Sequence, residues 1–454
     1  MRIFIFFLLT PFFVFPLDEN QMEKIAIEKV LKKDFEGALK IYEELYKKNP
    51  EKPSILQNLS NLYILLKKED KAEEVLKNLI KTEPEKSYAY KILRLLMMKK
   101  GKFLEWQNIS AEWYTKTKNE ESLKALIGAI VRTGNFSQAI KLMKKNRFQV
   151  PELEEIKENT KIKNLIFLIT LDTFRFDLIG KNVTPNLIKL IDESYFFKNA
   201  YSVSPITLPA HCSIFTGLSP RHNGVKDNSI YRLKDEAETL PEILKNYGYN
   251  SYAFISSYLL NRRFGLDQGF KAYQDNFIPL DKKKHFPSTR RAFDTISEAI
   301  KFLNNLKEEK AFFFIHLYDT HAPYEPPFPF DEAYPESPYK GEASYMDFVL
   351  GNFLNLLKKA KLYEKSMIIV ISDHGESLGE NGEPTHGFLL YEPTLHIPFI
   401  LHLPEQKIKK EMDTMASQVD ILPTILSILK IKYKKLDGEN LFNLKDEREI
   451  FSET

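Results

Sequence analysis

The sequence predicts an α/β domain with a mostly parallel sheet, preceded by an all-α domain of helical repeats. From about Asn20 to Val150, apolar residues recur at spacings of three and four, which is the pattern of amphipathic helices. Beyond Pro151, short apolar runs alternate with amphipathic stretches. Strands that are apolar on both faces and joined by helices indicate a parallel sheet covered by helices on both sides.

The composition is that of an ordinary folded protein, and 454 residues are enough for two folded units. Hydrophobic residues make up 43% of the chain and charged residues 28%. Lys and Arg number 65 against 62 Asp and Glu, so the formal charge of +3 argues against nucleic acid as a partner. Cys212 is the single cysteine, which excludes an intramolecular disulfide and a thiolate metal site.

Residues 1–17 form a predicted targeting segment. Arg2 is followed by an apolar stretch from Ile3 to Leu17 that only Thr10 interrupts. This stretch has the length of a signal-peptide core and falls short of the roughly 20 residues of a membrane span. The sequence therefore predicts export to the periplasm or the exterior. Because no small-x-small triplet precedes the expected cleavage point, an uncleaved membrane anchor is the alternative.

A repeat of 34 residues runs through the predicted helical domain, residues 20–150. Ala38 and Ala72 are 34 residues apart, and prolines recur at the same interval. This period resembles the tetratricopeptide repeat (TPR), and degenerate units continue around Trp106 and Ala139. Stacked helix pairs form a concave surface that usually binds protein or peptide, so we expect a protein partner. A helical bundle serving as a spacer is the alternative.

The second half of the chain contains candidate strands and helices in alternation. The strands are NLIFLITLD, SYAFISS, AFFFIHLYD, MIIVISD and PFILHLP. The helices are TPNLIKLIDESY, TLPEILKNY, TRRAFDTISEAIKFLNNLK, SYMDFVLGNFLNLLKKAK and SQVDILPTILSILK. The α/β domain is therefore expected over residues 160–454.

Three of these predicted strands end in an acid, namely Asp172, Asp319 and Asp373, and His321 and His374 follow two of them closely. In such sheets, ligands bind outside the carboxyl ends of the strands. A single aspartate at a strand end is often only a helix cap. Three acids with two histidines indicate a site where carboxylates and imidazole hold a divalent metal.

Thr207 lies in the segment SPITLPAHCSIFTG, just before a predicted helix with Pro209 in its first turn. A hydroxyl there faces the positive end of the helix dipole and is expected within reach of the metal. Both effects stabilise an alkoxide. The effect of a metal on the pKa of a bound hydroxyl is large, because a bound metal lowers the pKa of a water molecule from 15.7 to about 7. A threonine hydroxyl is a weak nucleophile alone, so Thr207 is a candidate nucleophile that depends on this effect.

Seven motifs in order, from LDTFRFD through TLPAHCSIFTG, PRHNGV, HLYDTHAPY, SDHGE and THG to QVDILPTIL, resemble the sulfatase family of the alkaline phosphatase superfamily. The resemblance extends from about Asn164 to the C-terminus and implies an alkaline-phosphatase-like fold. It implies a metal site in which Thr207 is the nucleophile. The histidines of HLYDTHAPY and THG resemble those that hold the anionic ester and its leaving group. The implied metal ligands are Asp172, Thr207, Asp373 and His374, and the implied catalytic residues are Thr207, His211, His321 and His386.

Two departures from the family pattern alter the expected chemistry. Sulfatases carry C-x-P-x-R or S-x-P-x-R, whose first residue is oxidised to formylglycine, whereas this chain has TLPAH. Threonine has a methyl group on its β-carbon, so its oxidation yields a ketone and no formylglycine is expected at Thr207. His211 replaces the arginine and is expected to contact the ester or to position Thr207. Cys212, inside the predicted helix, is interpreted as core packing.

The second departure is Thr173, which stands where many sulfatases have a second aspartate, and a histidine follows Asp373 in place of the frequent asparagine. This set is more similar to the superfamily's phosphodiesterases and to its phosphoethanolamine or phosphoglycerol transferases, which use a threonine nucleophile on zinc or manganese. We therefore expect phosphoester hydrolysis or phosphoryl transfer that depends on a divalent metal, namely Zn, Mn or Ca. The expected substrate is an anionic ester, carried by a glycan or by a lipid head group.

Two other functions stay open from the sequence. One is a sulfatase acting on a glycan or an aryl sulfate, and the other is a non-catalytic TPR binding protein with a degenerate enzyme domain. The family continues into a C-terminal subdomain with a small antiparallel sheet. REIFSET resembles the start of that subdomain, so the α/β domain is expected to lack it.

Several further residues receive predictions beside the main set. Asp319 is expected either to bind a second metal or to orient His321, and Glu376 to support His374. Arg175 and Asp177 are expected either to support the site or to begin a helix, and His222 is expected to be structural. The remaining histidines are interpreted as surface or strand residues, namely His285, His316, His396 and His402.

Overall fold

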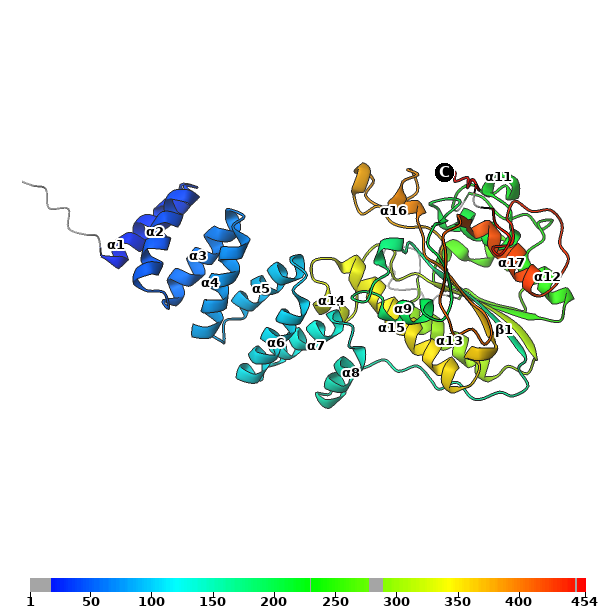
Figure 1. The fold of residues 1–454 in the computed structure, drawn as a ribbon, viewed down its shortest axis with the longest axis horizontal. Helices are drawn as coiled ribbons and strands as arrows, with labels where there is room; N and C mark the ends of the chain where they lie inside the picture. The colour runs from blue at the N-terminus through cyan, green and yellow to red at the C-terminus, as the bar shows by residue number, and fades with distance from the viewer. Residues whose placement is uncertain (1–17, 229, 277–288, 446) are drawn as a thin grey trace, which may run out of the picture. The chain divides into compact units, whose positions relative to one another are not determined.

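The computed structural model describes residues 18–228, 230–276, 289–445 and 447–454, so the predicted targeting segment and His285 lie outside the described residues. The chain divides into two compact units, with the boundary between Ala129 and Ile130 (Figure 1). Within the described ranges, no helix is both long enough and apolar enough to cross a membrane.

The first unit consists of antiparallel helix pairs with a regular period. Ala38 and Ala72 are fully buried in their helices, and Trp106 fills the position 34 residues further on. The third repeat therefore has a large buried ring where the first two have alanine. The helices of this unit are α1 (Glu19–Leu31), α2 (Phe35–Lys48), α3 (Pro53–Leu65), α4 (Glu69–Thr82), α5 (Ser87–Lys99) and α6 (Phe103–Thr117). The TPR-like repeats are thereby confirmed.

The helical segment continues across the unit boundary. Helix α7 spans Glu120–Arg132, and α8 (Phe136–Lys145) belongs to the second unit. There the ring of Phe136 packs edge-on against Phe330 and Phe348, with centroids 6.0 and 5.5 Å away. The residues predicted as one repeat domain, 20–150, are therefore distributed over both units.

The second unit is built on an eight-stranded sheet in the order β5-β4-β6-β1-β7-β8-β2-β9. Strands β5, β4, β6, β1 and β7 run parallel, whereas β8 is antiparallel to β7 and to β2, so the sheet is mostly parallel as predicted. The strands are β1 (Asn164–Leu171), β2 (Tyr195–Phe197), β4 (Asn250–Phe254), β5 (Ala272–Gln274), β6 (Lys310–Leu317), β7 (Ser366–Ser372), β8 (Phe399–His402) and β9 (Lys410–Met412). A separate pair joins β3 (Ala200–Tyr201) to β10 (Ala416–Ser417).

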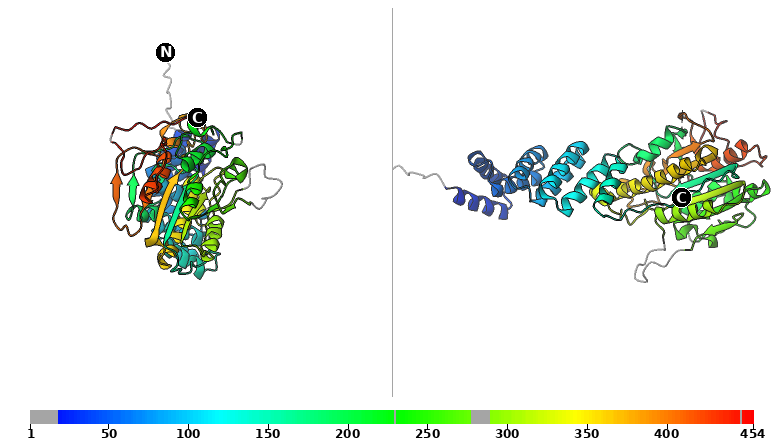
Figure 2. Two further views of the ribbon diagram at one scale, coloured as in Figure 1. Left: turned by 90° about the vertical axis from the view of Figure 1, so that its right-hand side faces the viewer. Right: turned by 90° about the horizontal axis from the view of Figure 1, so that it is seen from below.

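Helices cover both faces of the sheet (Figures 1 and 2). On one face, Leu168 and Phe314 pack against Phe215 of α10 and Ile425 of α17 in a single apolar core. On the other face, helices α13 and α15 lie over the central strands, where Phe167 of β1 contacts Phe353 of α15 at 5.5 Å. Burial on both faces explains why the strands are apolar throughout. The helices are α9 (Pro185–Ile191), α10 (Thr207–Thr216), α11 (Pro220–Asn223), α12 (Leu240–Asn246), α13 (Ala292–Asn304), α14 (Phe330–Ala333), α15 (Pro338–Lys359), α16 (Glu392–Leu395) and α17 (Ile421–Ile428).

Candidate active site

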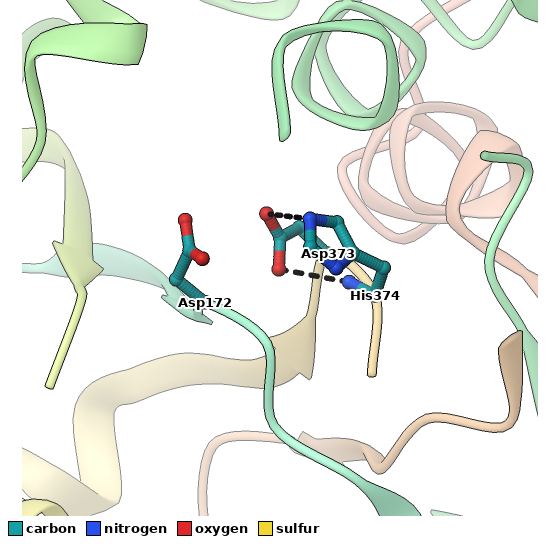
Figure 3. A group of neighbouring side chains, drawn as sticks. All are labelled: Asp172, Asp373 and His374. Atoms are coloured by element: carbon teal, nitrogen blue, oxygen red, sulfur yellow. Dashed lines mark hydrogen bonds and ion pairs between the residues drawn. The ribbon is translucent and has the colours of Figure 1, made fainter. Parts of the chain in front are cut away.

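Two aspartates come together at the carboxyl edge of the central strands. Leu171, the last residue of β1, pairs with Ser372, the last residue of β7, so the next residue of each strand reaches the same place. These residues are Asp172 and Asp373, both fully buried. Together with His374 they offer three possible ligand atoms that all lie within 4.8 Å of one another (Figure 3). The sequence had placed all three at strand ends.

Each carboxylate has one oxygen fixed by the protein and one without a hydrogen-bond partner. Oδ1 of Asp373 accepts the backbone N–H groups of Thr173 at 3.1 Å and of His374 at 2.8 Å. Oδ2 of Asp172 is 3.0 Å from Nε2 of His316. The other oxygens, Asp172 Oδ1 and Asp373 Oδ2, are buried and have no hydrogen-bond partner among the described residues.

Such oxygens fit a bound cation. Burial raises the pKa of the Asp172 carboxyl. Burial, followed by the charge of Asp172, raises the pKa of Asp373 well above its ordinary value. A buried carboxylate oxygen without a donor is unfavourable unless a positive charge faces it. The free oxygens of Asp172 and Asp373, with the imidazole of His374, are therefore a suitable donor set for a divalent metal.

Thr207 joins this group from the first residue of α10. The Nδ1–H of His374 donates to the carbonyl of Gly375 at 3.0 Å, which leaves the lone pair of Nε2 facing the site. The Thr207 hydroxyl lies 3.3 Å from that Nε2. The predicted nucleophile is therefore adjacent to the candidate metal ligands.

His211 lies beneath Thr207 and is fully buried. Its Nδ1 is 2.8 Å from the carbonyl oxygen of Thr207, and its Nε2 is 3.0 Å from the hydroxyl of Thr170. Burial, followed by the neighbouring His316, lowers the pKa of His211 to about 3, so the ring is neutral. Because both ring nitrogens are engaged, the contacts favour the positioning of Thr207 over direct contact with an ester.

His386 approaches the group from the loop after β7, with its ring centroid 4.5 Å from that of His374. Its Nδ1 is 3.2 Å from Oε1 of Glu376. Burial lowers the pKa of His386, but the hydrogen bond and the charge of Glu376 outweigh it and raise the pKa above the ordinary value. His386 is thus a candidate proton donor.

His321 follows β6 and lies beside His386, with 5.1 Å between the ring centroids. Its Nδ1 donates to the carbonyl of Ala322 at 2.8 Å, and its ring stacks on Tyr318 at 4.4 Å. Burial lowers the pKa of His321, so this imidazole is neutral. The pKa values of the two histidines are therefore shifted in opposite directions, a difference that the sequence did not indicate.

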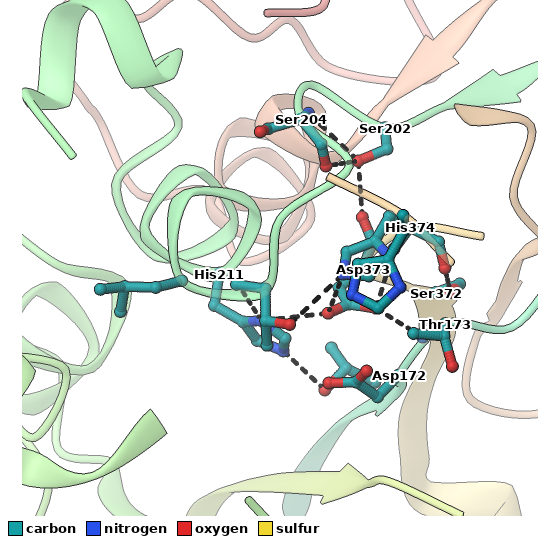
Figure 4. Close-up of polar contacts among 12 residues, drawn as sticks. Asp172, Thr173, Ser202, Ser204, His211, Ser372, Asp373 and His374 are labelled. Atoms are coloured by element: carbon teal, nitrogen blue, oxygen red, sulfur yellow. Dashed lines mark hydrogen bonds and ion pairs between the residues drawn. The ribbon is translucent and has the colours of Figure 1, made fainter. Parts of the chain in front are cut away.

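The hydroxyl groups of Ser202 and Ser372 bind backbone carbonyls next to the site (Figure 4). The Ser372 hydroxyl lies 2.6 Å from the carbonyl oxygens of Leu171 and His374. The Ser202 hydroxyl lies 2.5 Å from the carbonyl oxygen of Asp373. These contacts hold the two strand ends in a fixed relationship.

Two supporting residues have other partners than those predicted. Among the described residues, Asp319 contacts Ala292 and Arg291 and not His321, while a second metal at Asp319 stays a prediction. Its Oδ2 accepts the N–H of Ala292 at 2.9 Å, and its Oδ1 pairs with Nε of Arg291 at 3.0 Å. It therefore fixes the start of α13. Glu376 does not contact His374 but binds His386 and, at 2.8 Å, the hydroxyl of Tyr324.

Three other residues have the structural surroundings proposed for them. Cys212 is fully buried in the apolar core, which raises the pKa of its thiol. His222 is exposed and pairs with Asp437 at 2.7 Å. Arg175 pairs with Asp177 at 2.7 Å just before a short 3₁₀ helix.

His316 was missed as a site residue. The sequence predicts only a surface or strand position for it, and it does lie in β6, fully buried. Its contact with Asp172 nevertheless makes it part of the site. The one available signal was a histidine inside an otherwise apolar strand, AFFFIHLYD.

Sequence profiles of two known families match this chain. The sequence profile described as "Sulfatase" matches residues 164–431, and a "Tetratricopeptide repeat" profile matches residues 30–96. The chain is 27% identical over 353 residues to an ulvan-active sulfatase of Formosa agariphila, covering 65% of this chain and 67% of the relative. It is 26% identical over 326 residues to lipoteichoic acid synthase 2 of Bacillus subtilis, covering 63% and 48%.

Similarity to solved structures extends to the fold. The phosphonate monoester hydrolase of Agrobacterium radiobacter superposes with a TM-score of 0.52 at 17% identity, covering 63% of this chain and 78% of that one. At this identity the likeness shows a shared fold and nothing about activity.

Proposed function

This chain belongs to the sulfatase family, a family of hydrolases within the alkaline phosphatase superfamily, and from that membership we propose that it cleaves phosphate esters with Thr207 as nucleophile. The family membership makes it an enzyme, and anionic esters are its proposed substrates. The choice of phosphate over sulfate rests on Thr207 and its surroundings.

The observation that carries the proposal is the Thr207 hydroxyl, 3.3 Å from His374 Nε2 at the first residue of α10. The β-methyl of threonine excludes formylglycine at this position. A phosphorylated hydroxyl has a ready exit, because water or another acceptor displaces it in a second in-line step. A sulfated plain hydroxyl lacks the exit that the geminal hydroxyl of formylglycine supplies. The nucleophile therefore favours phosphoryl chemistry.

Asp172, Asp373, His374 and Thr207 would hold the divalent metal through the donor atoms described above. When bound, the ion would acidify the Thr207 hydroxyl and offset charge on the nonbridging oxygens of the ester. The identity of the ion, zinc, manganese or calcium, belongs to the proposal.

In the first step, Oγ1 of Thr207, which has released its proton to solvent, forms a bond to phosphorus while the bond from phosphorus to the alcohol oxygen breaks. Nε2 of His386, whose raised pKa favours the imidazolium, donates a proton to the departing alcohol. The neutral ring of His321, held by Tyr318 and Ala322, lies beside His386 and orients the ester.

In the second step, water attacks the phosphothreonine and the bond from phosphorus to Oγ1 of Thr207 breaks. His386, now neutral, accepts the proton of the attacking water, which restores the starting enzyme. A sugar or lipid hydroxyl in place of water would give transfer. The name of the Bacillus subtilis relative, a lipoteichoic acid synthase, supports keeping transfer within the proposal.

The test compares two threonines of the same helix. Thr207→Val removes only the nucleophilic hydroxyl, and we expect turnover of bis(4-nitrophenyl) phosphate to fall to background. Thr216→Val, at the far end of α10, is the matched control, because its hydroxyl binds two backbone groups, the carbonyl of Cys212 and the N–H of Leu218. Equal activity of Thr207→Val and wild type would refute the assignment.

Sulfate ester hydrolysis is the second candidate function, supported by the similarity to the ulvan-active sulfatase. Assays of matched aryl phosphate and aryl sulfate esters separate the two. Faster release of sulfate, lost in Thr207→Val, would replace the phosphate proposal with this one.

Export and a protein partner complete the proposal. The apolar stretch of residues 1–17 supports an exported or membrane-anchored enzyme. The tetratricopeptide match over residues 30–96 supports binding of a protein or peptide by the first unit. Fractionation of cells that express the chain tests the first point, since recovery in the cytoplasmic fraction would contradict it.

A further inference from the structure

His316 contacts the candidate metal ligand Asp172 from the neighbouring strand. The residue is fully buried in β6, and its partner in the register of β1 is Thr170. Its Nε2 lies 3.0 Å from Oδ2 of Asp172. The oxygen that His316 contacts is the one of Asp172 that is not free, so His316 acts on the site through Asp172.

A second contact fixes the tautomer of His316. The backbone N–H of Ser256, which follows β4, donates to Nδ1 of His316 at 3.4 Å. A neutral imidazole that accepts at Nδ1 carries its hydrogen on Nε2. His316 therefore donates to Asp172, and this donor occupies Oδ2 while Oδ1 stays free.

The two carboxylate oxygens of Asp373 also differ, because hydrogen-bond donors of the described residues reach only one of them. The N–H groups of Thr173 and His374 occupy its Oδ1 and leave Oδ2 free. Each carboxylate consequently offers a single oxygen. With the imidazole of His374 and the hydroxyl of Thr207, the donor set consists of four atoms, one of them nitrogen.

Such a set distinguishes between metals. Zinc binds few ligands, accepts imidazole readily and is satisfied by one oxygen from each carboxylate. Calcium takes six to eight oxygens and often uses both oxygens of a carboxylate. Hydrogen bonds that occupy the second oxygen of each aspartate therefore favour the smaller ion.

We propose that His316 is a positioning residue that limits Asp172 to one ligand oxygen and thereby makes the site prefer zinc to calcium. The inference rests on the metal site of the proposed function. It deepens that function by assigning the metal preference to a residue outside the set of ligands. The partners of metal ligands typically change metal affinity by 10- to 100-fold when they are replaced.

The experiment measures metal binding without substrate, so it stands apart from the choice between phosphate and sulfate. Zinc and calcium are titrated separately into the metal-free full chain by calorimetry. In His316→Phe we expect zinc affinity to fall about 10- to 100-fold and calcium affinity to stay within about threefold. His316→Gln, whose amide still reaches Asp172 as a donor, should retain most of the zinc affinity.

His402→Phe is the matched control, because His402 is also a fully buried histidine in a strand, β8, but binds the carbonyl of Glu193. It should leave both affinities unchanged. If His316→Phe does not fold, His316→Asn replaces it with the same expected result, since its shorter amide does not reach Asp172. Unchanged zinc affinity, an equal loss for both metals, or a wild-type preference for calcium would overturn the proposal.

Discussion

The hydroxyl of Thr207 lies 3.3 Å from Nε2 of His374, although 167 residues separate the two along the chain. One side chain begins helix α10 and the other follows strand β7, so the contact depends on how α10 packs against the end of the sheet. The proposed chemistry depends on this contact, because it places the nucleophile beside the free oxygens of Asp172 and Asp373.

His386 is predicted to matter most for esters with poor leaving groups. A proton donor helps an alkoxide to depart far more than a 4-nitrophenolate, which leaves readily without a proton. In His386→Gln we expect kcat/KM for an alkyl phosphodiester to fall about 100-fold, and that for a 4-nitrophenyl ester to fall much less. His396→Gln, a histidine that binds the carbonyl of Lys198, serves as the control. Equal losses for both esters would contradict the role of His386 as acid.

Removal of divalent metal is predicted to destabilise the second unit. Without a cation, nothing offsets the cost of burying the carboxyl groups of Asp172 and Asp373. We expect chelation to lower the melting temperature and added zinc to restore it. When the free ion is at 100 times its Kd, binding raises the free energy of unfolding by roughly 2.7 kcal/mol. Asp373→Asn should largely remove the response to zinc, whereas Asp177→Asn on the surface should keep it. A response to zinc that is equal in both variants would be inconsistent with the assigned site.

Asp347 of α15 is predicted to make the stability depend on pH. It is buried and accepts the N–H groups of Asn186 at 3.0 Å and Leu187 at 2.7 Å, but burial dominates and raises its pKa to about 7 from an ordinary value of 3.8. The folded state therefore retains a proton that the unfolded chain releases above about pH 4. The stability that this proton provides is fully present below that pH and is lost as pH rises towards 7.

The measurement compares the melting temperature of wild type and Asp347→Asn between pH 4 and 7. Since asparagine does not titrate, the melting temperature of wild type should fall relative to the variant as pH rises. While Asp347 titrates, the change amounts to at most about 1.4 kcal/mol per pH unit. A constant difference across this range would show that burial does not control this carboxyl group.

The central part of the fold could be predicted because its strands are buried on both faces. The runs that became β1, β6 and β7 are apolar enough to be recognised without any neighbours, and an acid or histidine directly after such a run stands out. Asp172, Asp373 and His374 were found in this way. The strands β2, β5 and β9 were not, since three residues are too few to show a pattern.

The contacts of the site depend on register and loop paths, which the sequence pattern does not specify. His316 reaches Asp172 because β6 pairs with β1 so that His316 lies opposite Thr170. Asp319 is close to His321 in sequence, yet it pairs with Arg291. A shift of one residue in the pairing of β6 would have turned His316 to the other face of the sheet.

The most direct test of the proposed function is to trap the phosphorylated enzyme. The full chain with zinc is mixed with bis(4-nitrophenyl) phosphate, quenched in acid during turnover and analysed by peptide mass spectrometry. We predict one phosphate on the peptide that contains Thr207, localised to that residue and absent from Thr207→Val. Turnover that continues with no phosphate on Thr207, or with phosphate on another residue, would contradict the central claim.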